Sequence, residues 1–295
     1  MSSEKDSNNV QLRNYFSLVK FSHTIFAMPF ALIGFFLAVK YAGFYLEWQV
    51  LILVILCMVL ARNAAMAFNR YIDRDIDAKN QRTSNRELPQ GILKSESVLM
   101  FVILNSLGFI VITLFINKLV FFLSPIALAV ILGYSYTKNF TFLCHFILGL
   151  GLSLAPIGAF LAVTGEFNLI PVLFSIIVLT WVSGFDIIYS LQDEDFDRGN
   201  QLKSVPVYFG KKGALVLSSV IHLISGLLVV YVGFLAGFGW VYFVGAIIFI
   251  TLLFYQNYIV KPDDLTKINI AFMTTNGIAS VIYAFFTILD LYIIS

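Results

Sequence analysis

The chain has 295 residues, of which 59% are apolar and only 12% are charged, with a formal net charge of +2 at pH 7. An average soluble domain carries about 25% charged residues, so this composition excludes a soluble globular protein, a disordered chain and a coiled coil. Cys57 and Cys144 lie in apolar runs without zinc-ligand spacing, and a disulfide scaffold is also excluded. No basic tract of the kind that binds nucleic acid is present, and we expect no nucleic-acid partner. The remaining class is an all-α, polytopic membrane protein.

Nine apolar stretches have the length of about 20 residues that a membrane-spanning helix needs. They predict a single transmembrane domain over residues 1–295. Residues 1–12 are polar and lack the pattern of a cleavable signal, so we expect a short cytoplasmic tail there. The expected spans are 20–39, 48–68, 97–116, 119–137, 142–163, 169–190, 213–234, 240–259 and 268–289.

The distribution of lysine and arginine predicts the orientation of these spans. With the N-terminus in the cytoplasm, 16 of the 19 basic residues lie on the cytoplasmic side. Lys40 and Lys118 fall on the opposite side, and Arg62 lies within the second span. Two long charged segments, 69–96 and 193–212, are then both cytoplasmic. No organellar transit peptide is visible, which favours a prokaryotic inner membrane.

The first charged segment carries a stripe of oxygen-bearing side chains. Asn69, Asp73 and Asp77 are four residues apart, a spacing that places them on one face of a helix. Carboxylates at this spacing repel one another unless a cation lies between them, and hard oxygen ligands suit Mg²⁺. Asp75 falls off this face, and we interpret it as a solvated surface acid.

The second charged segment repeats the pattern. Asp186, Asp193 and Asp197 recur at spacings of seven and four, again on one helical face, with Tyr189 between them. Asp186 lies near the end of the sixth span. An ionisable group at that depth is costly unless it is partnered, and a functional role is the default hypothesis.

Two acidic stripes on the same side of the membrane favour one or two Mg²⁺ ions that bind a polyanion between them. A diphosphate fits this arrangement, and the apolar surroundings suggest that it carries a lipid tail. Taken singly, each segment could also be an acidic cap where a helix leaves the membrane. The basic residues expected to clamp the outer phosphate oxygens are Arg82, Arg86, Lys138, Arg198 and Lys203.

At these residues the sequence resembles the UbiA superfamily of intramembrane prenyltransferases, and the resemblance covers nearly the whole chain. Within the superfamily it is most similar to 4-hydroxybenzoate polyprenyltransferases, including relatives that act in menaquinone synthesis. The matching segments are 20–31, 69–77, 82–91, 134–138, 144–149, 186–197 and 203–206.

The resemblance implies nine transmembrane helices around a central cavity, with both acidic motifs at its cytoplasmic end. It implies transfer of a polyprenyl group from a prenyl diphosphate to an aromatic acceptor such as 4-hydroxybenzoate, in ubiquinone- or menaquinone-type quinone biosynthesis. Asp186 and Tyr189 would lie toward the acceptor, with Asp186 as the candidate base. Two positions depart from the family pattern, which often has aspartate at Arg70 and arginine at Asn139. The residues that would hold two Mg²⁺ ions are Asn69, Asp73, Asp77, Asp193 and Asp197.

Four further polar residues lie within the expected spans or at the end of one. Arg62 is either the partner of an acidic group or a structural contact. His23 and His145 each serve in catalysis or form an interhelical hydrogen bond. Asp290 is expected at the outer membrane interface.

Several alternatives stay open at this point. The acceptor could instead be a naphthoate, haem or a non-aromatic lipid. An ion-coupled transporter also uses intramembrane acids and paired halves, but transport sites lie near the bilayer midplane, whereas the acids here gather at one face. A lipid phosphotransferase with a DGxxAR motif is excluded because the chain contains no Asp-Gly pair. If the protein were a non-catalytic scaffold, it would have no reason to keep two acidic stripes that can bind a metal.

Overall fold

The computed structural model describes residues 14–15, 17–19 and 26–294, and within these residues it forms helices and no β-strand. The expected cytoplasmic tail, His23 and the start of the first expected span lie outside the described residues. The helices are α2 (Met28–Phe36), η2 (Leu37–Tyr41), α3 (Trp48–Lys79), α4 (Ser95–Leu114), α5 (Lys118–Thr137), α6 (Cys144–Thr164), α7 (Leu169–Ser190), η3 (Leu191–Asp193), α8 (Glu194–Gly199), α9 (Val205–Leu235), α10 (Trp240–Ile259), η4 (Ile270–Thr275) and α11 (Asn276–Ile294).

Among the described residues, eight helical segments are long and apolar enough to cross a membrane. A shorter apolar helix, Met28–Tyr41, occupies the position of the first expected span. The prediction of an all-α polytopic membrane protein is therefore confirmed, and an apolar helix lies in each of the nine predicted stretches.

Local sequence explains where several helices begin and end. The side chains of Asn117 and Asn168 accept backbone N–H groups in the first turns of α5 and α7, which satisfies donors that have no partner inside a helix. Gly165 ends α6 in the left-handed conformation at φ 68°. Gly210 breaks α9 at φ 70°, so residues 205–209 form a short helix ahead of the long apolar one.

Helix α3 is longer than the expected span 48–68. Its 32 residues extend about 48 Å at 1.5 Å per residue, against a hydrocarbon thickness of about 30 Å. The chain turns polar after residue 68, but the helix continues to Lys79. The first acidic stripe is consequently carried by a rigid extension of this helix.

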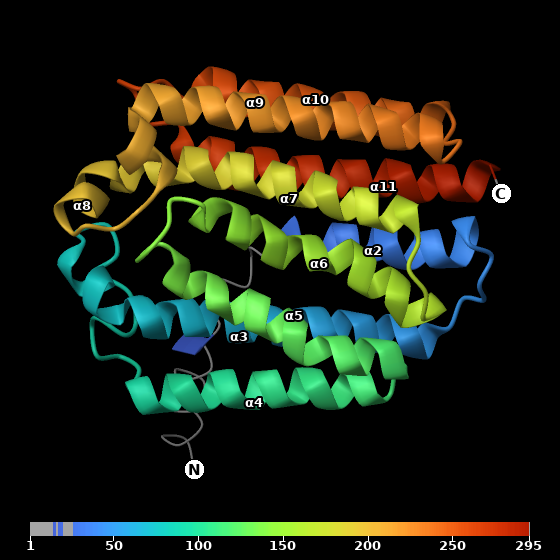
Figure 1. Ribbon diagram of the computed structural model, residues 1–295, viewed down its shortest axis with the longest axis horizontal. Coiled ribbons are helices and arrows are strands. Elements are labelled where there is room, and N and C mark those ends of the chain that lie inside the picture. The colour runs from blue at the N-terminus through green and yellow to red at the C-terminus, as the bar shows by residue number, and fades with distance from the viewer. Residues whose placement is uncertain (1–13, 16, 20–25, 295) are drawn as a thin grey trace, which may run out of the picture.

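The long helices lie side by side, and both charged connections gather at one end of the molecule, at the left of Figure 1. Helix α6 packs directly on α7. A Cβ atom added at Gly149 in α6 would lie 2.6 Å from the carbonyl oxygen of Leu179 and 2.5 Å from Ser183 Oγ, both in α7. The absence of a side chain at Gly149 thus allows the two helices to touch.

The core is rich in buried aromatic rings. Phe30, Trp181, Phe249 and Tyr283 form mutual ring contacts between α2, α7, α10 and α11. Beyond this cluster, Asp290 in α11 is buried within the protein. Its carboxylate accepts the N–H groups of Gly239 and Tyr242 at 2.8 and 3.0 Å, and it thereby caps the start of α10.

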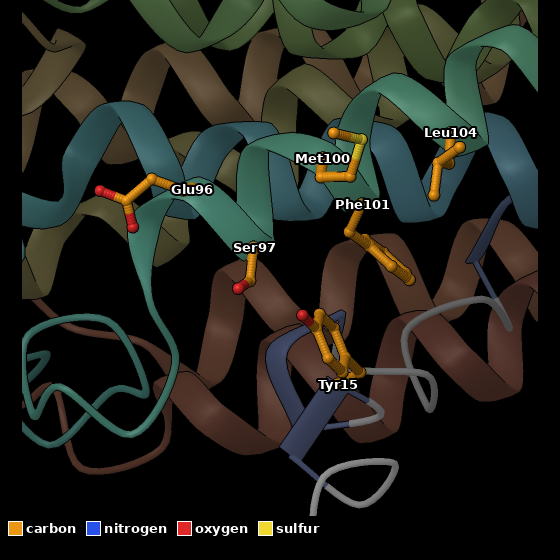
Figure 2. A pocket seen from close by; sticks show the side chains of 6 residues that line it. All are labelled: Tyr15, Glu96, Ser97, Met100, Phe101 and Leu104. Carbon is orange, nitrogen blue, oxygen red and sulfur yellow. The ribbon is translucent and has the colours of Figure 1, made fainter.

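A surface pocket lies between Tyr15 and the first turns of α4 (Figure 2). The Tyr15 ring stacks on Phe101 with a centroid separation of 5.0 Å. None of the site residues expected from the sequence lines this pocket, which is formed by Tyr15, Glu96, Ser97, Met100, Phe101 and Leu104.

Candidate active site

The stripe on α3 has the geometry that its spacing predicts. Asn69 Nδ2 donates to Asp73 Oδ2 at 3.1 Å, and the carboxylates of Asp73 and Asp77 are both buried. Asp75 points away from them, with a side chain that is 80% exposed and lies 3.7 Å from Arg74. The interpretation of Asp75 as a surface acid is confirmed.

Basic side chains neutralise the two buried carboxylates of α3. Lys138, just after α5, places its Nζ 2.6 Å from Asp73 Oδ2. Arg86 donates from Nη1 to both oxygens of Asp77 at 2.7 Å. Arg70 lies 4.0 Å from Asp77 and is itself buried. The residue that departs from the family pattern at position 70 therefore adds positive charge beside the stripe.

The second acidic segment meets the first through Asp193. Arg82 donates from Nε to Asp193 Oδ1 at 2.9 Å and from Nη2 to Oδ2 at 2.5 Å, a two-pronged pair. Asn80, the residue that follows α3, donates to the same Oδ1 at 3.0 Å. The two charged segments, more than 100 residues apart in sequence, are thus joined directly.

Arg82 also links this pair to the aromatic part of the site. Its Nη1 donates to the Tyr189 hydroxyl at 3.2 Å, and the Tyr189 ring stacks on Phe272 with centroids 4.1 Å apart. Partial burial alone would lower the pKa of the Arg82 guanidinium, but its hydrogen bonds with Asp193 raise that pKa above the ordinary value. Arg82 is charged at every physiological pH.

Asp186 lies on α7 and is held by α6. Its Oδ2 is 2.7 Å from His145 Nδ1, and the other ring nitrogen of His145 accepts the backbone N–H of Val205 at 3.2 Å. Of the two possibilities for His145, the structure therefore contains the interhelical hydrogen bond.

Two of the predicted residues, Arg198 and Lys203, have side chains that stand apart from this group of contacts, and a third, Asp197, lies beside it. Arg198 is 57% exposed and pairs with Glu194 on its own helix at 2.8 Å. The Lys203 side chain is exposed, although its backbone N–H donates to the Lys138 carbonyl at 2.7 Å. Asp197 is partly buried and lies near Asp193, Lys138 and Ser204; burial and then the negative charge of Asp193 raise the pKa of its carboxyl to about 6.

Three charged groups near the site have buried atoms without a hydrogen-bond partner among the described residues. They are Asp73 Oδ1, Arg62 Nε and Arg70 Nε. A buried polar atom without a partner carries a desolvation cost of about 1–3 kcal/mol. Such atoms mark positions where a ligand would restore the missing interaction.

The donor set fits a hard divalent cation such as Mg²⁺. It consists of carboxylate and amide oxygens, and Asp73 presents one buried oxygen that has no partner. Within the described part of the chain, no three His, Cys, Asp or Glu side chains converge as ligands of one ion, and the buried carboxylates of Asp73 and Asp77 each face a basic partner. A cation bound by these carboxylates would have to replace these basic partners.

Taken together, the fold and the site define an α-helical membrane protein that pairs two acidic segments with basic side chains at one end of its helices. The chain belongs to the UbiA prenyltransferase family, whose sequence pattern it matches over residues 27–278, and it is accordingly a prenyltransferase.

Curated relatives support this assignment along most of the chain. A 4-hydroxybenzoate octaprenyltransferase from Aliivibrio fischeri is 30% identical over 241 residues, which cover 80% of this chain and 83% of the relative. One from Citrobacter koseri is 29% identical over 225 residues, which cover 76% of this chain and 77% of the relative.

Solved structures share the fold. The apo structure of a UbiA homolog from Aeropyrum pernix K1 superposes with a TM-score of 0.82 at 29% identity, over 91% of this chain and 98% of that one. A UbiA homolog from Archaeoglobus fulgidus, solved with GPP and Mg²⁺, gives a TM-score of 0.77 at 19% identity, over 95% of this chain and 99% of that one.

Proposed function

We propose that this prenyltransferase moves a polyprenyl group from a prenyl diphosphate to an aromatic acceptor such as 4-hydroxybenzoate, with Mg²⁺, in quinone biosynthesis. The observation that carries the proposal is the direct contact between the two acidic segments through the Arg82–Asp193 pair. The names of the curated relatives favour this acceptor, and the Archaeoglobus fulgidus homolog was solved with GPP and Mg²⁺.

The acidic residues would hold the cation. Bound Mg²⁺ supplies positive charge that stabilises the leaving diphosphate. The residues that would hold it are Asn69, Asp73, Asp77, Asp193 and Asp197.

The basic residues would hold the diphosphate. Arg82, Arg86 and Lys138 now neutralise carboxylates, and they can turn to phosphate oxygens once those carboxylates bind the cation. Every charged group then keeps a counter-charge, so the exchange avoids a buried unpaired ion. Arg198 and Lys203, which are exposed, would extend this positive lining at its rim.

The reaction consists of one bond exchange and one proton transfer. The allylic C–O bond breaks and its electron pair leaves with the diphosphate oxygen. An aromatic ring carbon of the acceptor forms a C–C bond with the allylic cation, and the displaced ring proton moves to the Asp186 carboxylate. The stacked rings of Tyr189 and Phe272 offer π-faces that stabilise a nearby cation and exclude water.

Arg62 supports an acceptor that bears a carboxylate. Its buried Nε has no hydrogen-bond partner among the described residues, and it precedes Asn69 by two helical turns on α3. Arginine is the side chain best suited to a planar carboxylate. A carboxylated benzoate or naphthoate satisfies this donor, whereas a neutral lipid does not, and a naphthoate is therefore the second candidate acceptor.

We also propose that the acidic segments face the cytoplasm of a prokaryotic inner membrane. The excess of lysine and arginine at this end of the molecule supports this orientation.

A transfer assay on the purified protein tests the function. Radiolabelled geranyl diphosphate and Mg²⁺ are incubated with 4-hydroxybenzoate, with a dihydroxynaphthoate, and with phenol, which lacks the carboxylate. We expect prenylated 4-hydroxybenzoate that disappears with EDTA, and no product from phenol. Diphosphate release without transfer to any acceptor would overturn the choice of acceptor, and no Mg²⁺-dependent turnover would overturn the function.

A further inference from the structure

A histidine between the two motif-bearing regions is held in a defined state. His145 lies in the first turn of α6, and its side chain is 4% exposed. Its Nδ1 contacts Asp186 of α7, and its Nε2 faces the N–H of Val205, the first residue of α9. The imidazole thus contacts two other helices at once.

These two contacts assign the tautomer of His145. A backbone N–H can only donate, so Nε2 must present its lone pair to Val205. The proton of the neutral ring then resides on Nδ1 and is donated to Asp186 Oδ2. The Val205 N–H is one of the helix-start donors without an intrahelical partner, and its hydrogen bond uses the lone pair of Nε2.

In this arrangement only one of the two carboxylate oxygens of Asp186 makes a hydrogen bond with a residue that the structure describes. Its Oδ2 accepts from His145, whereas Oδ1 makes no hydrogen bond among the described residues, and the side chain is 21% exposed. A proton that arrives at this carboxylate must therefore bind Oδ1.

The same histidine ties Asp186 to the diphosphate end of the site. Val205 follows Lys203 by two residues, and the Lys203 N–H donates to the carbonyl of Lys138. The Lys138 ammonium in turn contacts Asp73 on α3. A continuous chain of contacts hence fixes where Asp186 lies relative to Asp73.

We propose that His145 is a positioning residue for the transfer reaction: it orients Asp186 with Oδ1 free to receive the ring proton, and it does not relay that proton. The proposal rests on the proposed function, in which Asp186 is the base. Misplacement of a reacting group, or loss of its supporting hydrogen bond, costs about 10- to 100-fold in rate.

Two substitutions separate the contacts of His145. In His145→Asn, the amide nitrogen lies near the position of Nδ1 and can still donate to Asp186, but the acceptor for Val205 is lost. In His145→Gln, the amide lies near the position of Nε2 and can still accept from Val205, but the donor to Asp186 is lost. Structural support by His145 alone predicts similar losses in both variants.

The kinetic test measures kcat and KM for 4-hydroxybenzoate prenylation with geranyl diphosphate and Mg²⁺. We expect His145→Gln to lose about 10- to 100-fold in kcat with little change in the KM for geranyl diphosphate. We expect His145→Asn to retain most activity, and His145→Gln to cost nothing further in an Asp186→Asn background. Equal losses in the two single variants, or an additive loss in the double variant, would overturn the proposal.

A second measurement does not depend on transfer. The chain has three histidines, and ¹⁵N-histidine NMR of the wild type, assigned with His145→Gln, reports the protonated nitrogen. We expect a neutral Nδ1–H ring whose shift changes in Asp186→Asn. A ring protonated on Nε2 would overturn the proposal even if the wild type transfers prenyl groups. If the wild type transfers none while the Nδ1–H ring is found, the proposed function fails and the orientation of Asp186 by His145 stands.

Discussion

Arg82 is the side chain that joins the two acidic segments. Its guanidinium pairs with both oxygens of Asp193 and donates to the hydroxyl of Tyr189. A lysine ammonium carries the same charge but cannot make this planar, two-pronged contact. The shape of the side chain at position 82 is thus as important as its charge.

We predict that Arg82→Lys lowers kcat/KM for geranyl diphosphate by about tenfold or more, the effect of one strong charge-assisted hydrogen bond. Arg74→Lys is the matched control, because the Arg74 side chain is exposed to a similar degree but contacts Asp75 and the Tyr71 ring outside the site. Steady-state kinetics of both variants provides the check. Equal losses of kcat/KM in Arg82→Lys and Arg74→Lys would show that the two-pronged contact of Arg82 has no special role.

Residue spacing predicted the stripe of Asn69, Asp73 and Asp77 and the exposure of Asp75, because a helical face depends only on local periodicity. The pairing of each acid with a particular base is a tertiary property that periodicity cannot supply. Asn80 was missed because it lies beyond the four-residue stripe, although an asparagine at a helix end was an available signal. The roles of these residues in binding the cation and the diphosphate stay predictions.

Asp290 is another residue whose contacts depend on a neighbouring helix and not on local periodicity. Its position near the end of an apolar stretch predicts the membrane interface, and the start of α10 lies beside it and supplies two N–H donors. This capping contact depends on a neighbouring helix and could not be read from the sequence.

At the scale of elements, hydropathy located the helices but not all of their ends. The apolar pattern ends near residue 68, whereas α3 continues to Lys79 because helical hydrogen bonds do not require apolar side chains. Likewise, α9 begins at Val205, ahead of the expected span, and bends at Gly210. The polar extension of α3 carries site residues, and the start of α9 adjoins Lys203 and contacts His145.

Contact between α6 and α7 provides a test at this scale. Gly149→Ala would press a methyl group against Leu179 and Ser183, and we predict a loss of about 1–3 kcal/mol from overpacking. Gly158→Ala in the same helix meets no atom within 4 Å and should be neutral or slightly stabilising. Thermal unfolding of the two variants in detergent measures the difference, and similar midpoints would contradict the packing account.

At the scale of the whole molecule, the long helices place connections 80–94 and 191–204 at one end (Figure 1). The sequence anticipated this placement because four spans separate the two segments. The turn 165–168 between α6 and α7 belongs to the opposite end.

The proposed orientation predicts which engineered cysteines a membrane-impermeant reagent reaches. In a variant without Cys57 and Cys144, Ser84→Cys in the connection 80–94 should react only when the cytoplasmic face is open. Glu166→Cys should react from outside intact cells. The reverse pattern would contradict the orientation, and labelling of both positions from one side would contradict the arrangement of spans.

Binding of geranyl diphosphate tests the central claim most directly, because it isolates the site from the identity of the acceptor. Isothermal titration of the purified protein would compare wild type, Asp73→Asn and Asp75→Asn, each with Mg²⁺ and with EDTA, with unfolding midpoints confirming that each variant is folded. We predict Mg²⁺-dependent binding that Asp73→Asn weakens by about tenfold or more, since the buried stripe loses a charged ligand, and that the exposed Asp75→Asn leaves unchanged. Binding that is equally tight in EDTA, or that Asp73→Asn leaves intact, would contradict the account.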